Sequence, residues 1–158
     1  MQQFKVTIKS DKGDEIVLGN LGEESKDRAA NAIAGTVTGV DVRFDTIDEN
    51  VTQKSHGMIA RVTVYGRILK ENHKTLKEVM QWAIDNKGDT EYRNVLVEMI
   101  VSAGEEAYGY EIPDMFVVDY AESYHGEGSG DGSVQKLPDT FELKLSQRAN
   151  YLSEINPF

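Results

Sequence analysis

The second half of the chain contains three long stretches in which polar and apolar residues alternate. They span residues 92–103, 107–125 and 138–149, and a short turn and then a glycine-rich connection join them. The third is the most regular, with polar and apolar residues in strict turn: Thr140, Phe141, Glu142, Leu143, Lys144, Leu145 and Ser146. A period of two places polar side chains on one face of a β-strand and apolar side chains on the other. These stretches therefore predict long strands with one dry face and one wet face.

Shorter alternating stretches precede them. Phe4, Val6 and Ile8 alternate with polar residues, residues 11–14 (Asp-Lys-Gly-Asp) are typical of a turn, and apolar character resumes over 15–21. This pattern predicts a β-hairpin. Residues 22–35 are polar and alanine-rich, which fits either a loop or a short helix.

Two more strands are expected between residues 36 and 68. In the first, Val40, Val42 and Phe44 alternate with charged residues, and the second alternates from about His56 or Gly57 to Ile68. The two could form an extended hairpin whose tip, residues 45–55, stands clear of the body. That tip is either a mobile surface loop or a docking arm.

One amphipathic helix is expected over residues 73–86. Thr75 followed by Glu78 matches a capping box, and Gly88 is a usual helix stop. An apolar stripe at helical spacing should pack on the sheet and comprises Leu76, Val79, Met80, Ala83 and Ile84. Trp82 lies about 120° from Leu76, outside this stripe. It is either folded over the edge of the core or reserved for a partner subunit.

Composition describes an ordinary globular protein. A length of 158 residues predicts a single domain spanning residues 1–158. No apolar run approaches the roughly 18 residues that a membrane span needs, and the alternating first ten residues do not match a secretory signal. The expected location is therefore cytoplasmic. The absence of cysteine excludes disulfides, thiolate catalysis and cysteine zinc sites.

The net charge of −10 is concentrated in one part of the sequence. Between Asn94 and Gln135 there are nine acidic residues and no lysine or arginine, whereas the remainder holds 17 basic and 18 acidic residues (27 minus 9). Such a field repels phosphate backbones and anionic lipid, which argues against a nucleic-acid or membrane-surface binder. A solvated acidic surface that keeps the protein in solution is the simpler interpretation.

No catalytic, cofactor or metal motif is present. The three histidines are scattered without zinc-site spacing, and Asp119, Ser123 and His125 lie on one stretch, whereas triad members usually come from separate elements. The glycines of residues 126–137 match neither a phosphate-binding loop nor an EF-hand. The sequence therefore predicts no enzyme and no cofactor. Residues 126–137 are expected to form a flexible connection.

Three segments carry a resemblance to a known family: residues 92–100 (YRNVLVEMI), 110–120 (YEIPDMFVVDY) and 141–147 (FELKLSQ). Together with the order of the expected elements, they resemble the tube-protein family of phage tails, contractile injection systems and type VI secretion. The secretion member of that family is the haemolysin-coregulated protein, Hcp. The resemblance covers residues 57–149, and the segment before them matches by element order alone.

The resemblance implies a mainly β fold, an antiparallel barrel or sandwich with one packed amphipathic helix. It also implies that six copies form a ring and that rings stack into a hollow tube of a phage tail, a tail-like particle or a contractile injection or secretion system. The implied partners are further copies of the chain and sheath or baseplate proteins, with no membrane and no sequence recognition of nucleic acid. The long connection over residues 126–137 departs from the family pattern.

Within that interpretation, two sets of residues are assigned. The self-assembly set comprises Phe44, Asp45, Ile47, Trp82, Glu98 and Tyr120. The lumen-facing set comprises Asp41, Arg43, Arg61, Thr63, Glu142 and Lys144. The alternative function is a monomeric β-sandwich module that binds a cationic or carbohydrate ligand through the acidic, glycine-rich end.

Overall fold

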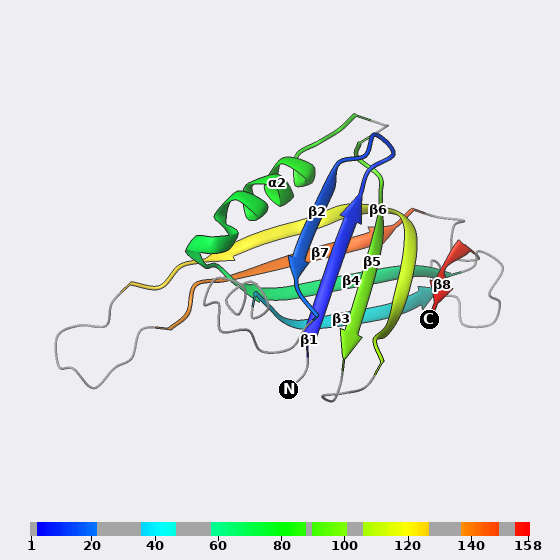
Figure 1. The fold of residues 1–158 in the computed structure, drawn as a ribbon. Coiled ribbons are helices and arrows are strands. Elements are labelled where there is room, and N and C mark those ends of the chain that lie inside the picture. The colour runs from blue at the N-terminus through cyan, green and yellow to red at the C-terminus, as the bar shows by residue number, and fades with distance from the viewer. Residues whose placement is uncertain are drawn as a thin grey trace.

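The structure is a computed structural model that describes residues 3–21, 36–46, 58–87, 90–100, 106–126, 137–148 and 154–158. Over these residues it is mainly β with one α-helix, as predicted (Figure 1). In chain order the elements are β1 (Gln3–Lys9), β2 (Glu15–Gly19), β3 (Val37–Thr46), β4 (Met58–Arg67), the 3₁₀ turn η1 (Lys70–Asn72), α2 (His73–Ala83), β5 (Arg93–Ile100), β6 (Tyr108–Ser123), β7 (Thr140–Gln147) and β8 (Asn156–Pro157). Three segments of the prediction lie wholly or mostly outside the described residues: the loop or short helix at 22–35, the hairpin tip at 45–55 and the connection at 126–137.

All strands join in one antiparallel sheet with the order β2-β1-β5-β6-β7-β4-β3, and β8 pairs with β6. In Figure 1 the group β2, β1 and β5 crosses over the group β7, β4 and β3 at a large angle. The sheet therefore folds into two layers, and β3 approaches β1 across the open side. This arrangement agrees with the barrel or sandwich that the family resemblance implies.

Strand β6 belongs to both layers. Its first half pairs with β5 and its second half, from Met115 to Ser123, pairs with β7. Between the halves, Pro113 is followed by Asp114 in the left-handed region (φ 53°), and the Asn94 Oδ1 accepts the Asp114 N–H at 3.3 Å. The register with β5 shifts here, which marks a bulge, and bulges bend a strand. A bent strand lets one continuous sheet fill two layers.

The core lies between these layers and is closed at one side by α2, which packs on β6 and β2. Its members are the inward residues that the alternation predicts, among them Val6, Ile8, Ile16, Leu18, Val62, Val64, Val95, Val97, Leu143 and Leu145. Each is 3% exposed or less. Period-two patterning therefore identified the buried faces of these strands.

The helix begins at His73 as predicted and ends at Ala83, three residues before the predicted end, and its N-terminal capping differs from the prediction. Asn72 is the N-cap residue and α2 begins at His73, so Thr75 lies within the first turn and the predicted capping box is wrong. The Asn72 side chain instead fixes the preceding turn: its Oδ1 accepts the Leu69 N–H at 2.8 Å and its Nδ2 donates to the Arg67 carbonyl at 2.7 Å. The asparagine therefore joins the end of β4 to the helix.

The buried face of α2 also differs from the predicted stripe. Leu76, Val79 and Trp82 are buried, whereas Met80 is 47% and Ile84 is 76% exposed. The helix is turned toward the tryptophan because the indole ring buries a larger apolar area than methionine or isoleucine. Its Nε1–H also finds an acceptor, the Glu91 carbonyl at 2.8 Å. Of the two roles open to Trp82, the core role is the one that this burial favours.

Candidate functional site

The outward side of β3, β4, β7 and the second half of β6 forms a continuous face of polar and charged side chains, here called the charged face. The strand registers align Asp41, Thr63, Lys144 and Asp119 in one row across it. Neighbouring rows contain Arg43 beside Arg61, and Tyr65 beside Glu142. All six residues of the predicted lumen-facing set, Asp41, Arg43, Arg61, Thr63, Glu142 and Lys144, thus share this face.

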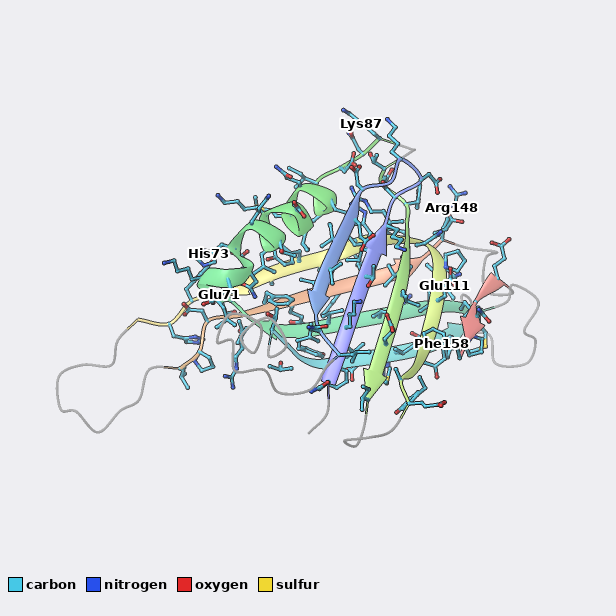
Figure 2. All side chains as sticks on the ribbon, in the orientation of Figure 1. Glu71, His73, Lys87, Glu111, Arg148 and Phe158 are labelled. Carbon is cyan, nitrogen blue, oxygen red and sulfur yellow. The ribbon has the colours of Figure 1, made fainter. Side chains whose placement is uncertain are left out.

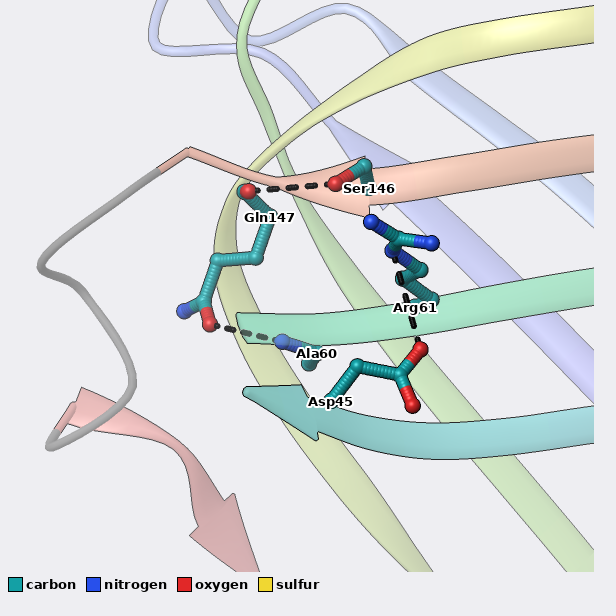
Figure 3. A network of polar contacts seen from close by, with 5 residues as sticks. All are labelled: Asp45, Ala60, Arg61, Ser146 and Gln147. Carbon is teal, nitrogen blue, oxygen red and sulfur yellow. Dashed lines mark hydrogen bonds and ion pairs between the residues drawn. The ribbon is translucent and has the colours of Figure 1, made fainter. Parts of the chain in front are cut away.

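The charges of this face balance although the chain as a whole is acidic. It carries four cationic residues (Arg43, Arg61, Arg67 and Lys144) and four anionic ones (Asp41, Asp45, Asp119 and Glu142), a formal sum of zero. Two exposed ion pairs lie on it, Arg61 Nε to Asp45 Oδ2 and Lys144 Nζ to Glu142 Oε1, both at 3.7 Å (the first in Figure 3). Exposed pairs contribute about 0 to 1 kcal/mol each. The face therefore has no net charge and exposes its charged side chains to water.

The described acidic residues between positions 94 and 135 do not gather on one face. Asp119 belongs to the charged face, because it lies opposite Lys144 in the register of β6 with β7. Glu98 and Glu111 lie in the other layer, opposite Lys5 and Leu96 in the registers of β5 with β1 and β6. Folding thus separates charges that are neighbours in the sequence.

Tyr65 lies in the middle of the charged face, and sequence analysis gave it no role. Its hydroxyl donates to the Asp41 Oδ2 at 3.2 Å. Partial desolvation and then this bond to Asp41 raise the pKa of the Tyr65 phenol above 10.0. Two hollows adjoin its ring, one of about 210 Å³ toward Glu142 and one of about 300 Å³ toward Tyr108. Aromatic and carboxylate groups together favour cationic or hydroxyl-bearing ligands.

Within the described parts of the chain, no group of three or more histidine, aspartate and glutamate side chains is placed to hold a metal ion. Over those same residues, no helix has the length and apolar character to cross a membrane.

A buried glutamine fixes the strands beneath the charged face (Figure 3). Gln147 is 1% exposed; its Oε1 accepts the Ala60 N–H and its Nε2 donates to the Pro113 carbonyl, both at 3.3 Å. The Ser146 hydroxyl donates to the Gln147 carbonyl at 3.3 Å. One side chain thereby links β4, β7 and the bend of β6. The alternation in β7 gives no signal of it, because it places Gln147 on the core side without indicating a partner.

The structure does not bring the predicted self-assembly set together. Phe44, 38% exposed on β3, packs edge-on against Tyr110 with ring centroids 5.8 Å apart. Asp45 is next to it and pairs with Arg61. Glu98 is half-buried in the other layer, so these positions do not form one patch.

The remaining members of that set are also dispersed. The half-buried Tyr120 donates its hydroxyl to Glu122 Oε1 at 2.7 Å, so its polar tip has a partner within the chain. Trp82 is 2% exposed and lies under the Arg93 guanidinium, 5.4 Å from the ring centroid. Ile47 lies outside the described residues.

Strand β8 was not predicted. An Asn-Pro-Phe sequence is not typical of a strand, because proline lacks the N–H that a ladder uses. In the structure Gly109 and Phe158 exchange two backbone hydrogen bonds, with N to O distances of 2.8 and 3.0 Å. In Figure 2, β8 with Phe158 lies beside the part of β6 that carries Glu111.

No family model and no curated protein matches this sequence. Among solved structures, the crystal structure of an Hcp protein aligns over 100% of this chain and 96% of its own, with a TM-score of 0.54 and 10% identity. Hcp1 from Salmonella typhimurium (TM-score 0.47, 13% identity, 90% of this chain and 81% of that one) and the tube-terminating cap of the anti-feeding prophage (TM-score 0.44, 14% identity, 98% and 87%) are also similar. The fold assignment rests on the first, whose TM-score exceeds 0.5.

The class that fold and sheet topology define is an antiparallel β-sandwich closed by one helix. Within that class, the chain has the fold of an Hcp protein along its whole length. This confirms the fold that the sequence resemblance implied.

Proposed function

We propose that this chain is a structural, noncatalytic subunit that assembles with copies of itself into hexameric rings, which stack into a hollow tube. The tube would belong to a phage tail, a phage-tail-like particle or a contractile injection or secretion system. The observation that carries the proposal is the Hcp fold across the entire chain, combined with a sheet face built of solvated charges.

The charged face is the proposed lining of the lumen. A water-filled channel needs a wall that stays hydrated, and a two-layer sheet supplies one by facing its polar side outward. The four cationic and four anionic side chains of this face would give a lining without net charge. Such a lining neither retains nor excludes a passing molecule by its charge alone.

The sheet edges support lateral assembly. Strands β2 and β3 end the sheet path, so each presents one edge that no other strand of the described sheet covers. Free edges are a hazard in a monomer, and a neighbouring copy removes the hazard when a ring closes. We therefore propose these two edges as the lateral contacts, with Phe44 and Asp45 on β3 as the members of the predicted assembly set that lie at such an edge.

Sheath or baseplate proteins are the proposed partners of the assembled tube. The proposed locations follow from the same role: the cytoplasm before assembly and the particle or apparatus afterwards. The hairpin tip at residues 45–55 remains the proposed contact to an adjacent ring.

The surroundings of Tyr65 favour a second candidate, a monomeric binding module for a cationic or carbohydrate ligand. There the phenol is bonded to Asp41 and lies beside Glu142, next to two hollows. This location differs from the glycine-rich end expected from the sequence. The two functions separate by oligomeric state, because a binding module of this kind requires one copy.

The test is light scattering after size-exclusion chromatography together with negative-stain microscopy over a range of protein concentrations. Tube assembly predicts a mass near six chains and rings of about 80 to 100 Å in diameter, the size expected from closing six domains of ordinary dimensions. A monodisperse monomer without rings at every concentration would contradict the proposal and favour the binding module.

Two matched substitutions locate the contacts. Val17→Glu adds a charge on edge strand β2, where the side chain is 37% exposed, and should suppress rings. Thr63→Glu adds the same charge on the charged face, between Asp41 and Lys144, and should leave the rings intact. If Thr63→Glu abolishes rings and Val17→Glu does not, the charged face is an interface and not a lining.

A further inference from the structure

The edge of β6 that β8 covers has a geometry of its own. Strand β5 takes one edge of the first half of β6, and β7 pairs along the other edge only from Met115 onward. On that other edge the first half of β6 is covered by β8, with Tyr110 opposite Pro157 and Glu111 opposite Asn156. Because β6 changes partner at its bend, it leaves a half-edge that a short extended segment can fill.

The half-edge is shaped at Gly109. A Cβ atom built there would lie 1.8 Å from the Val97 carbonyl oxygen, so β5 approaches too closely for any side chain. On the other side, the Gly109 N–H donates to the Phe158 carbonyl at 2.8 Å, and the Phe158 N–H donates to the Gly109 carbonyl at 3.0 Å. Gly109 therefore pairs with an extended backbone through both its own N–H and its own carbonyl.

The three residues of the occupant are exposed: Asn156, Pro157 and Phe158 lie on the surface, and Phe158 retains 50% of its accessible surface. The preceding residue, Ile155, is half-buried and packs against the core. Pro157 has no N–H to contribute. A segment with few buried contacts opens at a low free energy compared with the core strands.

We propose that this half-edge, Gly109–Glu111, is a strand-acceptor site, and that in assemblies of this chain the segment Asn156–Phe158 of a second copy occupies it. The contacts are the same whichever copy supplies the segment, so exchange costs no contact in the site. Neighbouring copies held in one assembly raise the effective concentration of a second segment. The site would thereby link copies in addition to the contacts at the lateral edges. The inference rests on the proposed self-association only because it requires a second copy.

Engineered cysteines provide the test, because the chain has none of its own. Glu111 and Asn156 are exposed register partners, and a directly opposed pair of this kind has Cα atoms about 5.5 Å apart, within the range that a disulfide bridges. First, Glu111→Cys and Asn156→Cys are combined in one dilute chain and oxidised. An internal disulfide is expected, and its absence would overturn the site itself.

Second, the two single variants are mixed at high concentration and oxidised. Exchange predicts a covalent species of twice the 17.6 kDa chain mass on a nonreducing gel. The matched control pairs Glu111→Cys with Pro157→Cys, one residue out of register and on the opposite face. A yield at least several-fold above this control and above each variant alone supports exchange, and equal yields would overturn it.

The cross-link and the rings are independent readouts. A register-specific cross-link without rings would leave this inference in place and remove the hexameric tube. Rings without the cross-link would leave the tube in place and remove strand exchange.

Discussion

Replacing Trp82 with phenylalanine tests how the helix packs on the sheet. The indole Nε1–H donates to the Glu91 carbonyl at 2.8 Å, and Arg93 lies over the ring. Loss of the hydrogen bond costs about 0.5 to 1.5 kcal/mol, and a weaker cation–π contact costs about 0.5 to 1 kcal/mol. With the volume lost from a site that is 2% exposed, the free energy of unfolding should fall by about 2 to 4 kcal/mol.

The assay is urea unfolding followed by far-ultraviolet circular dichroism, since Trp82 is the single tryptophan and its fluorescence disappears with the substitution. Met80→Ala on the same helix is the matched control. The Met80 side chain is 47% exposed, so its loss should change the free energy of unfolding by no more than about 0.5 kcal/mol.

The opposite ranking would refute the reasoning. If Trp82→Phe left monomer stability unchanged while it reduced self-association, the indole would serve a partner subunit. If Met80→Ala were the more destabilising change, the helix would present the stripe predicted from its sequence.

Two further substitutions test the sheet and its ionisation. Gly109→Ala forces a Cβ against the Val97 carbonyl and should lower the free energy of unfolding by about 2 kcal/mol or more in urea melts. In the control Gly126→Ala, where a Cβ would have no atom within 4 Å, the free energy of unfolding should change by no more than about 0.5 kcal/mol. Similar values for both variants would contradict this packing. Burial first, and then the Glu122 carboxylate that accepts its hydroxyl hydrogen, raise the pKa of Tyr120 above 10.0. Because its pKa is raised, the protonated Tyr120 phenol stabilises the folded state. This stabilisation is present below the unfolded pKa near 10 and is lost as pH rises through the folded pKa. Glu122→Gln should lower the pKa of Tyr120 partway toward 10.0 in an ultraviolet titration, and an unchanged titration would exclude the role of Glu122.

The sequence predicted the strands well because alternation reports directly on a sheet with one buried face. Val62 and Val64 on β4, and Leu143 and Leu145 on β7, are buried where the period of two places them. The predicted strands were longer by a few residues at their ends, where the polar pattern continues but the described pairing stops. Local pattern thus identified the buried face of each strand without fixing where its pairing ends.

Features that depend on contacts between distant segments could not be read in the same way. The buried Trp82 contacts Glu91 and Arg93, which follow the helix in the chain, and the helical period alone cannot include those partners. The charge balance of the charged face arises when β3, β4, β7 and the second half of β6 align, although the acidic residues cluster in the sequence. The half-edge under β8 exists because β6 bends at Pro113, which no periodicity reveals.

The central claim is that copies of this chain surround water with the outward side of β3, β4 and β7. A cryo-electron microscopy reconstruction of the assembled protein measures this directly, because it gives both the symmetry and the orientation of each subunit. The account predicts six-fold rings with Thr63 and Lys144 lining the central channel. A reconstruction that places these two side chains on the outer wall or between subunits would contradict it.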